Sequence, residues 1–431
     1  LFMHRCLGVG GRRMSMPMPP PKRKNPALRT RPMHPPPAAR SRIGLGLTAA
    51  AARGELALQV CQACGAHQYP PRESCCRCPS THLKWQAQSG LGQLLAITTL
   101  SHSNDLFFRE RLPWRLGMVA LDVGVSVLVH LHEDVDTPNQ NVRVLARLDR
   151  AGQAVLIAVP TQPSPHWQET SMMREMGCDP KHRKILITDG KSPTGQALAR
   201  ACVAAGAQTV WVGHAEPWKK LPGLDELATL PGVSLIPLDL TNERDVAKVS
   251  GGIGGKVDIV INNAEAHRTH GIADRAGTDA ARFEMDLNYF GLLRLAQSLG
   301  PALKGRAADG PANAVAWVNV LSIYALANFP AHGTYSASKA AAYSLAQCLR
   351  AEMRPFGIRV INVFPGPVED EWFQSLPPPK LNPDVLARAI VKALQEGTED
   401  VYPGDVAQEW LQRWREDPKI LEREIAAGDG Q

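Results

Sequence analysis

The sequence has no apolar run of about 18 residues, so it offers no candidate for a helix that spans a membrane. It also has no Asp or Glu between Leu1 and Arg53, where eleven Lys and Arg occur. Residues 54–431 hold 37 basic and 41 acidic residues, a net charge of −4, whereas the whole chain carries +7. The basic excess therefore belongs to an N-terminal tail, and it gives little reason to expect that the folded part binds nucleic acid.

Cysteine is scarce outside one short segment. Five of the nine Cys lie between Cys61 and Cys78, and the others are scattered at Cys6, Cys178, Cys202 and Cys348. This distribution favours a reducing compartment and one metal site over a disulfide framework, so we expect a cytoplasmic protein. The stretch Ile43–Ala52 has some features of a signal-peptide core, but an Ala-rich amphipathic helix is the favoured interpretation.

Composition and hydrophobic pattern divide the chain into five segments. Residues 1–42 form a basic, Pro-rich tail that we expect to be disordered, and residues 43–85 hold the Ala-rich helix and the cysteine cluster. Residues 86–160 contain five short β patterns typical of a small barrel or sandwich, and residues 161–183 form a linker. In residues 184–431, six Val- and Ile-rich runs alternate with helical stretches. That alternation predicts an α/β domain with a doubly wound parallel sheet.

The cysteine cluster contains two Cys-x-x-Cys pairs separated by ten residues. Two such pairs can place four thiolates tetrahedrally around one ion, usually Zn²⁺, and the ligands would be Cys61, Cys64, Cys75 and Cys78. Four thiolates leave no open position on the ion, so the site is expected to be structural. Iron has the same ligand set in rubredoxin-like sites and stays an alternative, as does a register that uses Cys76.

A resemblance appears at these residues. The Cys-x-x-Cys-Gly, Tyr-Pro-Pro-Arg and second Cys-x-x-Cys elements, followed by five strands, resemble zinc-ribbon/OB-fold proteins associated with acyl-CoA enzymes. The resemblance covers residues 43–160 and implies an acyl-CoA ligand or a thiolase-like or aldolase-like protein partner. An OB barrel can also bind single-stranded nucleic acid, for which Phe107, Phe108 and Trp114 would be the stacking residues. Core packing of these aromatics is the favoured interpretation.

A second constellation lies in the C-terminal domain. Tyr335 and Lys339 are four residues apart, so a helix places both on one face. A Lys ammonium beside a Tyr phenol favours the phenolate, and we expect it to pull the Tyr pKa from about 10 toward neutrality. Tyr335 can then exchange a proton with a carbonyl or alcohol oxygen. Ser322 follows an apolar run and is expected at the carboxyl end of a strand, where open α/β sheets bind ligands.

These residues resemble the pattern of the short-chain dehydrogenase/reductase family over residues 184–431. Asn288, in the segment FEMDLNYFG, matches the helix Asn of that family's catalytic tetrad. The resemblance implies that Tyr335 is the acid/base, that Lys339 tunes it and holds the nicotinamide ribose, that Ser322 orients the substrate oxygen, and that Asn288 anchors a water in a proton relay. It also implies an NAD(P) cofactor and a homo-oligomer. The implied cofactor-binding residues are Thr188, Gly190, Gly195, Asp239, Leu240, Asn262, Ala264, Tyr335, Lys339, Pro365 and Gly366.

The chain departs from the family pattern at three positions. Asp189 and Pro193 stand where the first two glycines of the phosphate-binding loop are expected, and Glu265 replaces the Gly of the Asn-Asn-Ala-Gly motif. Pro193 removes one N–H, and Asp189 brings a carboxylate toward the anion, although Lys191 supplies a positive charge. The second strand ends at His214 without the acid that selects NAD, which leaves NADP open.

Two hypotheses follow. In the first, the protein is an NAD(P)-dependent oxidoreductase that acts on a carbonyl or alcohol group, as a CoA thioester or another small molecule, and the ribbon and barrel serve for docking. In the second, the cofactor loop has decayed and the protein is an accessory or scaffold subunit for a thiolase-like or aldolase-like partner. His267 and His270, near the same segment, are interpreted as residues of a polar loop.

Overall fold

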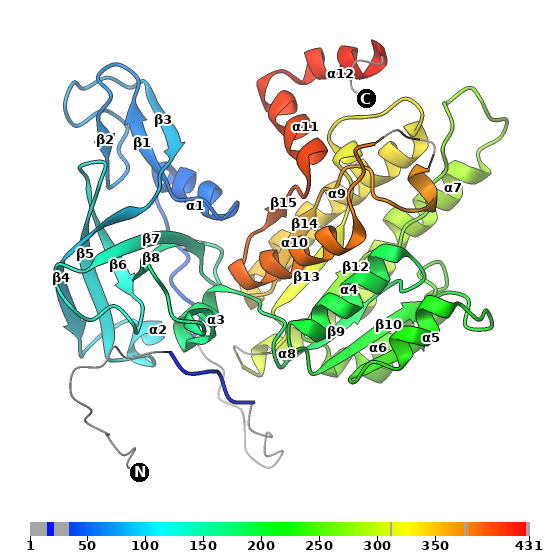
Figure 1. Ribbon diagram of the computed structural model, residues 1–431, viewed down its shortest axis with the longest axis horizontal. Helices are drawn as coiled ribbons and strands as arrows, with labels where there is room; N and C mark the ends of the chain where they lie inside the picture. The colour runs from blue at the N-terminus through cyan, green and yellow to red at the C-terminus, as the bar shows by residue number, and fades with distance from the viewer. Residues whose placement is uncertain (1–14, 21–33, 311–312, 375, 377, 428–431) are drawn as a thin grey trace. The chain divides into compact units, whose positions relative to one another are not determined.

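The computed structural model describes residues 15–20, 34–310, 313–374, 376 and 378–427 (Figure 1). These residues form two compact units. The first contains residues 15–20, 36–149 and 153–176, and the second contains residues 34–35, 150–152 and 177–427. Most of the predicted disordered tail, residues 1–14 and 21–33, lies outside the described residues. Among the helices in the described ranges, none is long and apolar enough to cross a membrane.

The first unit begins with the predicted Ala-rich helix. The 3₁₀ turn η1 (Arg42–Gly44) leads into α1 (Leu45–Ala51), which buries Leu47, Ala50 and Ala51. The ribbon follows as a small antiparallel sheet in the order β2-β1-β3, with β1 at Ala57–Cys61, β2 at His67–Gln68 and β3 at Leu83–Ala87. Cys61 ends β1, and the other cysteines of the cluster lie in the two loops of this sheet.

The remaining strands of the first unit close into a barrel in the order β4-β5-β6-β8-β7. Alternate residues point inward, as in β6, where Val127, Val129 and Leu131 are buried. This closed barrel confirms the five-strand prediction. The predicted linker contains η2 (Trp167–Glu169) and α3 (Ser171–Met176), and Met173 and Met176 pack against strand β8. The barrel elements are β4 (Leu91–Leu100), α2 (Leu106–Arg109), β5 (Trp114–Leu121), β6 (Ser126–Leu131), β7 (Asn141–Leu148) and β8 (Ala154–Pro160).

The second unit is built on a parallel sheet in the order β11-β10-β9-β12-β13-β14-β15, which confirms the doubly wound α/β prediction. Strand order reverses between β9 and β12, and ligands of such sheets bind beside that point at the carboxyl ends. The two-residue edge strand β15 has no counterpart among the six predicted runs, because it is too short to give an apolar pattern. The strands are β9 (Lys184–Ile187), β10 (Thr209–His214), β11 (Val233–Pro237), β12 (Ile259–Asn262), β13 (Ala316–Val320), β14 (Arg359–Val363) and β15 (Asp400–Val401).

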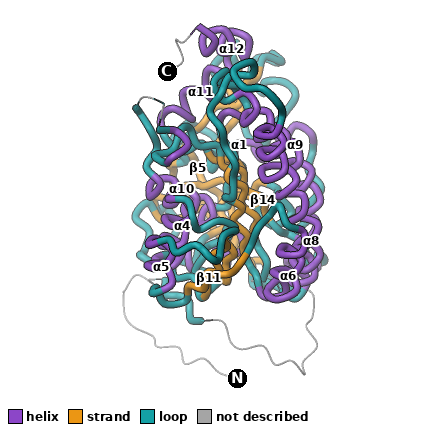
Figure 2. Tube along the Cα trace, turned by 90° about the vertical axis from the view of Figure 1, so that its right-hand side faces the viewer, coloured by secondary structure: helices purple, strands orange, loops and turns teal. Residues whose placement is uncertain are grey.

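Helices cover both faces of this sheet (Figure 2). Strand residues alternate between two apolar cores: Ile185 and Ile187 pack toward α4 and α10, whereas Leu186 packs toward the side of α6 and α8. The elements are α4 (Pro193–Ala204), α5 (Pro222–Ala228), α6 (Glu243–Ile253), η3 (Gly254–Lys256), α7 (Asp279–Met285), the π-helix η4 (Asp286–Phe290), α8 (Gly291–Ala308), η5 (Ile323–Ala325), α9 (Gly333–Met353), η6 (Arg354–Phe356), η7 (Glu371–Phe373), α10 (Pro383–Glu396), α11 (Asp405–Glu416) and α12 (Pro418–Ala427).

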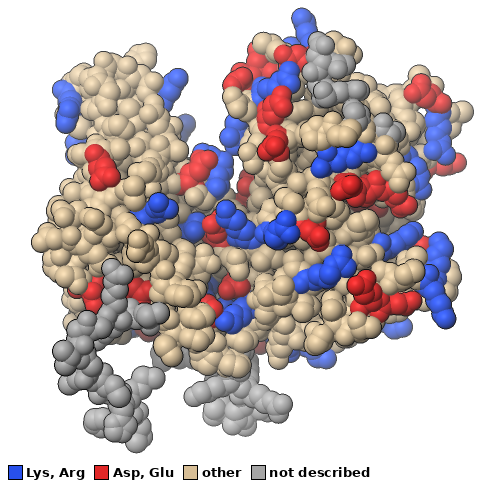
Figure 3. Space-filling view, in the orientation of Figure 1, with Lys and Arg blue, Asp and Glu red and all other residues tan. Residues whose placement is uncertain are grey.

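Charged residues on the visible face of the second unit are mixed in sign. Figure 3 shows Lys and Arg beside Asp and Glu across this face, not gathered in one basic patch. This face does not have the clustered positive charge that nucleic-acid binding requires.

Candidate active site and metal centre

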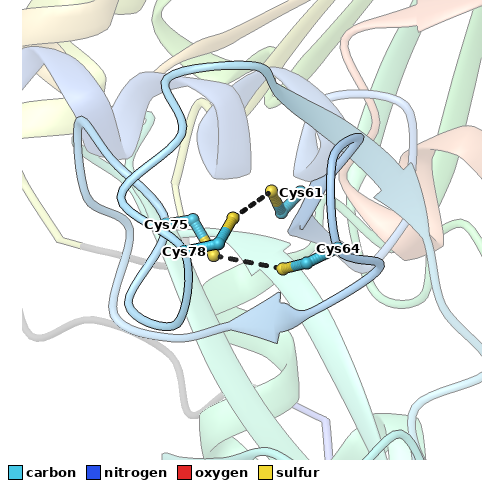
Figure 4. A group of neighbouring side chains, drawn as sticks. All are labelled: Cys61, Cys64, Cys75 and Cys78. Atoms are coloured by element: carbon cyan, nitrogen blue, oxygen red, sulfur yellow. Dashed lines mark hydrogen bonds between the residues drawn. The ribbon is translucent and has the colours of Figure 1, made fainter.

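The four predicted cysteine ligands converge in the ribbon (Figure 4). Their Sγ atoms all lie within 4.8 Å of one another, and the pairs Cys61–Cys78 and Cys64–Cys75 are each 3.6 Å apart. Sulfurs bound tetrahedrally to zinc at about 2.3 Å are about 3.8 Å apart, so the spacing fits a closed four-thiolate site. The group brought together is Cys61, Cys64, Cys75 and Cys78, the more regular of the two predicted registers.

Backbone geometry favours thiolate at one of these ligands. The Arg77 amide donates to the Cys75 Sγ at 3.3 Å, and it is the main reason that the pKa of Cys75 is lowered to about 6. A deprotonated sulfur is the form that binds metal. A bound ion would link the loop after β1 to the loop before β3, which is a structural role.

The aromatic segment of the barrel is part of a packed cluster. Phe107 and Trp114 are buried, and the Trp114 Nε1 donates to His130 Nδ1 at 2.8 Å. The Arg111 guanidinium lies 3.9 Å from the centre of the Phe107 ring and pairs with Glu175 at 3.0 Å. These contacts agree with core packing and not with a row of rings open to bases.

The carboxyl edge of the second unit's sheet is fixed by Thr188 and Asn263. The Thr188 hydroxyl donates to Asn262 Oδ1 at 3.1 Å and accepts from the amides of Asn263 and Ala264 at 3.0 and 3.1 Å. Asn263 holds the loop after β9, since its side chain accepts from the Asp189 amide at 3.0 Å and donates to the Asp189 carbonyl at 2.7 Å. Asn263 is absent from the predicted cofactor-binding residues, although it lies within the motif that supplied Asn262.

Asp189 closes the loop that leads into α4. Its carboxylate accepts from the Lys191 and Ser192 amides, both at 3.1 Å, and burial raises its pKa. Ser192 is the N-cap of α4, with Oγ accepting from the Gly195 amide at 3.2 Å. Two backbone amides of this loop are therefore bonded to the Asp189 carboxylate of the same loop.

Both predicted loop glycines are required by close packing. A Cβ at Gly195 would lie 1.8 Å from the Asp189 carbonyl oxygen, and one at Gly190 would lie 2.2 Å from Val212. After β11, Asp239 Oδ1 accepts from the amide and the hydroxyl of Thr241 at 2.8 and 2.7 Å, which forms a local turn. The neighbouring Leu240 carbonyl accepts from Arg294 at 3.1 Å.

Ser322, Tyr335 and Lys339 meet beside the carboxyl end of β13. All three are about 2 % exposed or less. Tyr335 and Lys339 lie one turn apart on α9, and Ser322 follows β13. Ser322 and Tyr335 line a pocket whose other members include Asn263, Glu265, Pro365, Gly366 and Asp370. The structure thus brings two predicted catalytic residues, Ser322 and Tyr335, to the same pocket as the predicted Pro-Gly element.

Glu265 lies between the two catalytic side chains of α9. Its Oε2 accepts from the Tyr335 hydroxyl at 3.0 Å and is 2.8 Å from the Lys339 Nζ, which also donates to the Val320 carbonyl at 3.1 Å. Burial raises the pKa of Tyr335 well above its ordinary value, and the Glu265 carboxylate raises it further. The expected lowering of this pKa by Lys339 is therefore wrong, because the phenol is buried and because Glu265 pairs with the ammonium and accepts a hydrogen bond from the phenol.

Asp370 is a second carboxyl group in the pocket that the sequence did not reveal. It lies in the loop after β14, and its pKa is raised to about 7 by burial and by repulsion from Glu265. A lone Asp in a loop gives no sequence pattern that marks it as a site residue.

Asn288 supports the segment that carries Glu265. It lies in the π-helix η4, where its Nδ2 donates to the Ala266 carbonyl and to Ser338 Oγ, both at 2.8 Å. Its Oδ1 accepts from the Ala266 amide, also at 2.8 Å. Its role as the anchor of a relay water stays a prediction.

A buried histidine pair forms the wall behind Tyr335. His267 stacks on the Tyr335 ring with centroids 3.9 Å apart, and its Nε2 lies 2.6 Å from His332 Nδ1. Burial is the main cause that lowers the pKa of His267 to about 2 and that of His332 to about 4, so both are neutral. His267 lies in the loop after β12, as interpreted, but it is buried there and enclosed by Phe373 and Tyr335.

Comparison with known proteins agrees with the division into units. Residues 183–380 match the family described as short chain dehydrogenase. Residues 48–83 match the rubredoxin-like zinc ribbon domain of ChsH2, and residues 85–150 match the C-terminal OB-fold domain of ChsH2. The three matches follow one another along the chain in the predicted order.

Individual relatives each cover about half of the chain. The chain is 31% identical over 207 residues to the short-chain dehydrogenase ptmH of Penicillium ochrochloron, covering 46% of this chain and 71% of that protein. It is 30% identical to the 3-ketodihydrosphingosine reductase TSC10 of Yarrowia lipolytica, again over 46% of this chain, and spans about half of that relative, 54%. A crystal structure of a short chain dehydrogenase from Burkholderia cenocepacia in complex with NADP is 32% identical, with a TM-score of 0.51, covering 57% of this chain and 98% of that one.

Proposed function

The chain belongs to the short-chain dehydrogenase family, and from this premise we propose that it is an NAD(P)-dependent oxidoreductase that interconverts a carbonyl and an alcohol on an acyl-CoA-linked substrate. The observation that carries this proposal is the meeting of Ser322, Tyr335 and Lys339 beside one pocket at the carboxyl edge of the sheet. Ligands of open α/β sheets bind at this edge.

The chemistry assigned to the chain is proton transfer at the substrate oxygen. A bound nicotinamide would supply or accept the hydride. Tyr335, whose pKa is raised by burial, would donate its proton to the carbonyl oxygen, and Ser322 would orient that oxygen by a hydrogen bond. Burial of these groups excludes water, which strengthens their hydrogen bonds to the reacting atoms.

The residues near the pocket fit a nicotinamide in part. Pro365 and Gly366 line the pocket beside Tyr335, and Thr188 with Asn263 fixes the strand ends next to the loop. The N-terminus of α4 would hold the pyrophosphate, although the nearby Lys191 ammonium pairs with Glu216 at 3.1 Å and the Asp189 carboxylate accepts from two amides of the loop. Gly190, Gly195, Asp239, Leu240, Asn262 and Ala264 would complete the surroundings of the cofactor.

The first unit is proposed as a docking module. Its zinc ribbon and OB-type barrel resemble proteins associated with acyl-CoA enzymes, and this supports an acyl-CoA ligand or a thiolase-like or aldolase-like protein partner. In this proposal Zn²⁺ is structural, the protein is a homo-oligomer, and the cysteine distribution supports a cytoplasmic location. The choice between NAD and NADP stays open.

A second candidate is an accessory subunit of an acyl-CoA complex with an impaired cofactor site. The observation that favours it is the Asp189 carboxylate, which accepts from two amides of the loop that would otherwise face the pyrophosphate. Glu265 adds a negative charge beside the catalytic pair.

The experiment that separates the two candidates is a fluorescence titration of the purified protein with NADPH and NADH, followed by turnover of acetoacetyl-CoA. We expect saturable cofactor binding and measurable reduction of the thioester substrate. Tyr335→Phe should retain cofactor binding and lose turnover by about 10²–10⁴-fold, as expected for removal of a general acid.

A failure to bind either nucleotide at millimolar concentration would contradict the oxidoreductase proposal. In that case Asp189→Gly, which frees the amides of Lys191 and Ser192, tests whether the carboxylate is the cause. Restored binding in this variant together with co-purification of a thiolase-like or aldolase-like protein would favour the accessory subunit.

A further inference from the structure

Glu265 is held in place on both sides along the chain. The amide of the preceding Ala264 donates to Thr188 Oγ1 at 3.1 Å. The following Ala266 is bonded through both its amide and its carbonyl to the Asn288 side chain, each at 2.8 Å. Because both neighbours are anchored, the backbone of Glu265 has little freedom, and its side chain is directed to Tyr335 and Lys339.

The Glu265 carboxylate makes the contacts that a ligand oxygen would make. One oxygen, Oε2, accepts from the Tyr335 hydroxyl at 3.0 Å and lies 2.8 Å from the Lys339 Nζ. A carbonyl substrate needs the Tyr335 hydrogen bond for proton transfer. The carboxylate and the substrate oxygen therefore compete for one donor.

We propose that Glu265 is a positioning residue that orients the Tyr335 hydroxyl and the Lys339 ammonium and occupies the substrate-oxygen position until a carbonyl substrate displaces it. The catalytic part of this inference rests on the proposed oxidoreductase function. The effect of Glu265 on Tyr335 does not, because it follows from contacts within the chain.

The other groups that face Tyr335 do not replace the effect of Glu265. Asp370, from the loop after β14, is a further carboxyl group, and like Glu265 it raises the pKa of Tyr335. The Ser322 hydroxyl lowers the pKa of Tyr335 through a hydrogen bond. His267 and His332 are neutral, so they bring no positive charge, and Lys339 is already paired with Glu265.

The test is a pH titration of tyrosinate absorbance, made without cofactor or substrate. The signal of Tyr335 is isolated by subtracting the titration of Tyr335→Phe. In Glu265→Gln, the carboxylate charge is lost and Lys339 is released, so we expect Tyr335 to ionise at least one pH unit lower than in the parent protein. One unit corresponds to about a tenfold change in proton affinity. Glu265→Gly, which places the family's residue at this position, should shift the titration in the same direction.

The matched control is Glu369→Gln, which removes the same charge from an exposed position in the loop that also carries Asp370. Circular dichroism identifies the pH range in which each variant stays folded. An unchanged Tyr335 titration in both Glu265 variants, or an equal shift in Glu369→Gln, would overturn the inference.

Kinetics provide the second readout. In Glu265→Gly, the KM for acetoacetyl-CoA should fall several-fold and the alkaline limb of the pH–rate profile should move to lower pH. A changed kcat with an unchanged pH profile would point to a merely structural role and would overturn the inference. If no variant binds NADPH or NADH, the oxidoreductase proposal fails, and the tyrosinate titration still decides the effect of Glu265 on Tyr335.

Discussion

At the residue scale, three carboxyl groups set the electrostatics of the pocket and its loop. Glu265 faces the catalytic pair, Asp370 faces Glu265, and Asp189 closes the loop before α4. Each is placed by contacts from a different strand end, and the pKa values of Asp189 and Asp370 are raised by burial. A substrate bound in this pocket would lie beside the carboxyl groups of Glu265 and Asp370.

Asp370 makes the stability of the protein depend on pH. Its pKa is raised from 3.8 to about 7 by burial and by Glu265, so between about pH 4 and pH 7 the folded state binds more protons than the unfolded state. The free energy of unfolding therefore falls as the pH rises through this window, and this contribution levels off above it. Asp370→Asn should reduce the slope, measured by urea unfolding at several pH values.

The substitution keeps an acceptor for the local structure. The Asp370 Oδ1 accepts from the amides of Trp372 and Phe373 at 2.9 and 3.3 Å, and an Asn oxygen can do the same. The exposed Glu371 provides the control, since Glu371→Gln should leave most of the slope in place. If the free energy of unfolding depends on pH with the same slope in the parent protein and in Asp370→Asn, Asp370 is not the cause of that dependence.

At the element scale, the first turn of α4 connects the loop to the site. Ser192 caps the helix, Pro193 starts it with a fixed φ, and Gly195 allows the close approach of the Asp189 carbonyl. Pro193 is thus accommodated as the first helical residue, where its missing N–H costs no intrahelical hydrogen bond. Pro193 departs from the family's glycine pattern, but it is compatible with the formation of α4.

The caps of α4 and α10 give a matched pair of variants. Ser192→Ala and Asn382→Ala each remove a side-chain acceptor from a helix N-terminus, so each should lower the free energy of unfolding by about 1 kcal/mol. Only Ser192→Ala should weaken NADPH binding, because Ser192 lines the pocket. Urea unfolding and a nucleotide titration measure the two effects. An equal loss of affinity in Asn382→Ala would show that general loosening, and not the loop, is responsible.

At the scale of the whole molecule, both units have large apolar cores, but the four cysteine ligands belong to none of them. The second unit has two large apolar cores, one on each face of its sheet. The ribbon cluster, in contrast, consists of Cys61, Ala66 and Cys75 with Leu83 packed against it. Leu58 of β1 belongs to the barrel core, but the small cluster around the cysteines cannot order the loops that carry them. We therefore expect the bound metal to supply most of the free energy that orders these loops.

Metal removal should therefore loosen the ribbon loops of the first unit and leave the second unit folded. We expect about one zinc per chain, and we expect chelation or Cys75→Ser to make the ribbon loops between β1 and β3 sensitive to limited proteolysis, while nucleotide binding by the second unit is retained. Cys348→Ser, at an exposed position on α9, is the control and should keep its metal. Protection of the loops after complete chelation would contradict the structural role of the metal.

The sequence by itself determined the features that depend on spacing along the chain. Two Cys-x-x-Cys turns, a Tyr and a Lys four residues apart, and the alternation of apolar runs with helices each encode local geometry, because a turn or a helix fixes the relative positions of near neighbours. These patterns predicted the thiolate group, the α9 face and the doubly wound sheet.

Only the tertiary structure showed which charged groups lie beside the catalytic residues. Glu265 and Tyr335 are 70 residues apart, and Asn263 and Asp189 are 74 apart, yet each pair is hydrogen-bonded. Parallel strands bring their carboxyl ends to one edge of the sheet, so residues that follow different strands meet there whatever their separation in sequence. The contact between Tyr335 and Lys339 could be predicted from a helix, but the carboxylate between them could not. Burial of the phenol, together with that carboxylate, raises the pKa of Tyr335, whereas the sequence had led us to expect a lowered pKa.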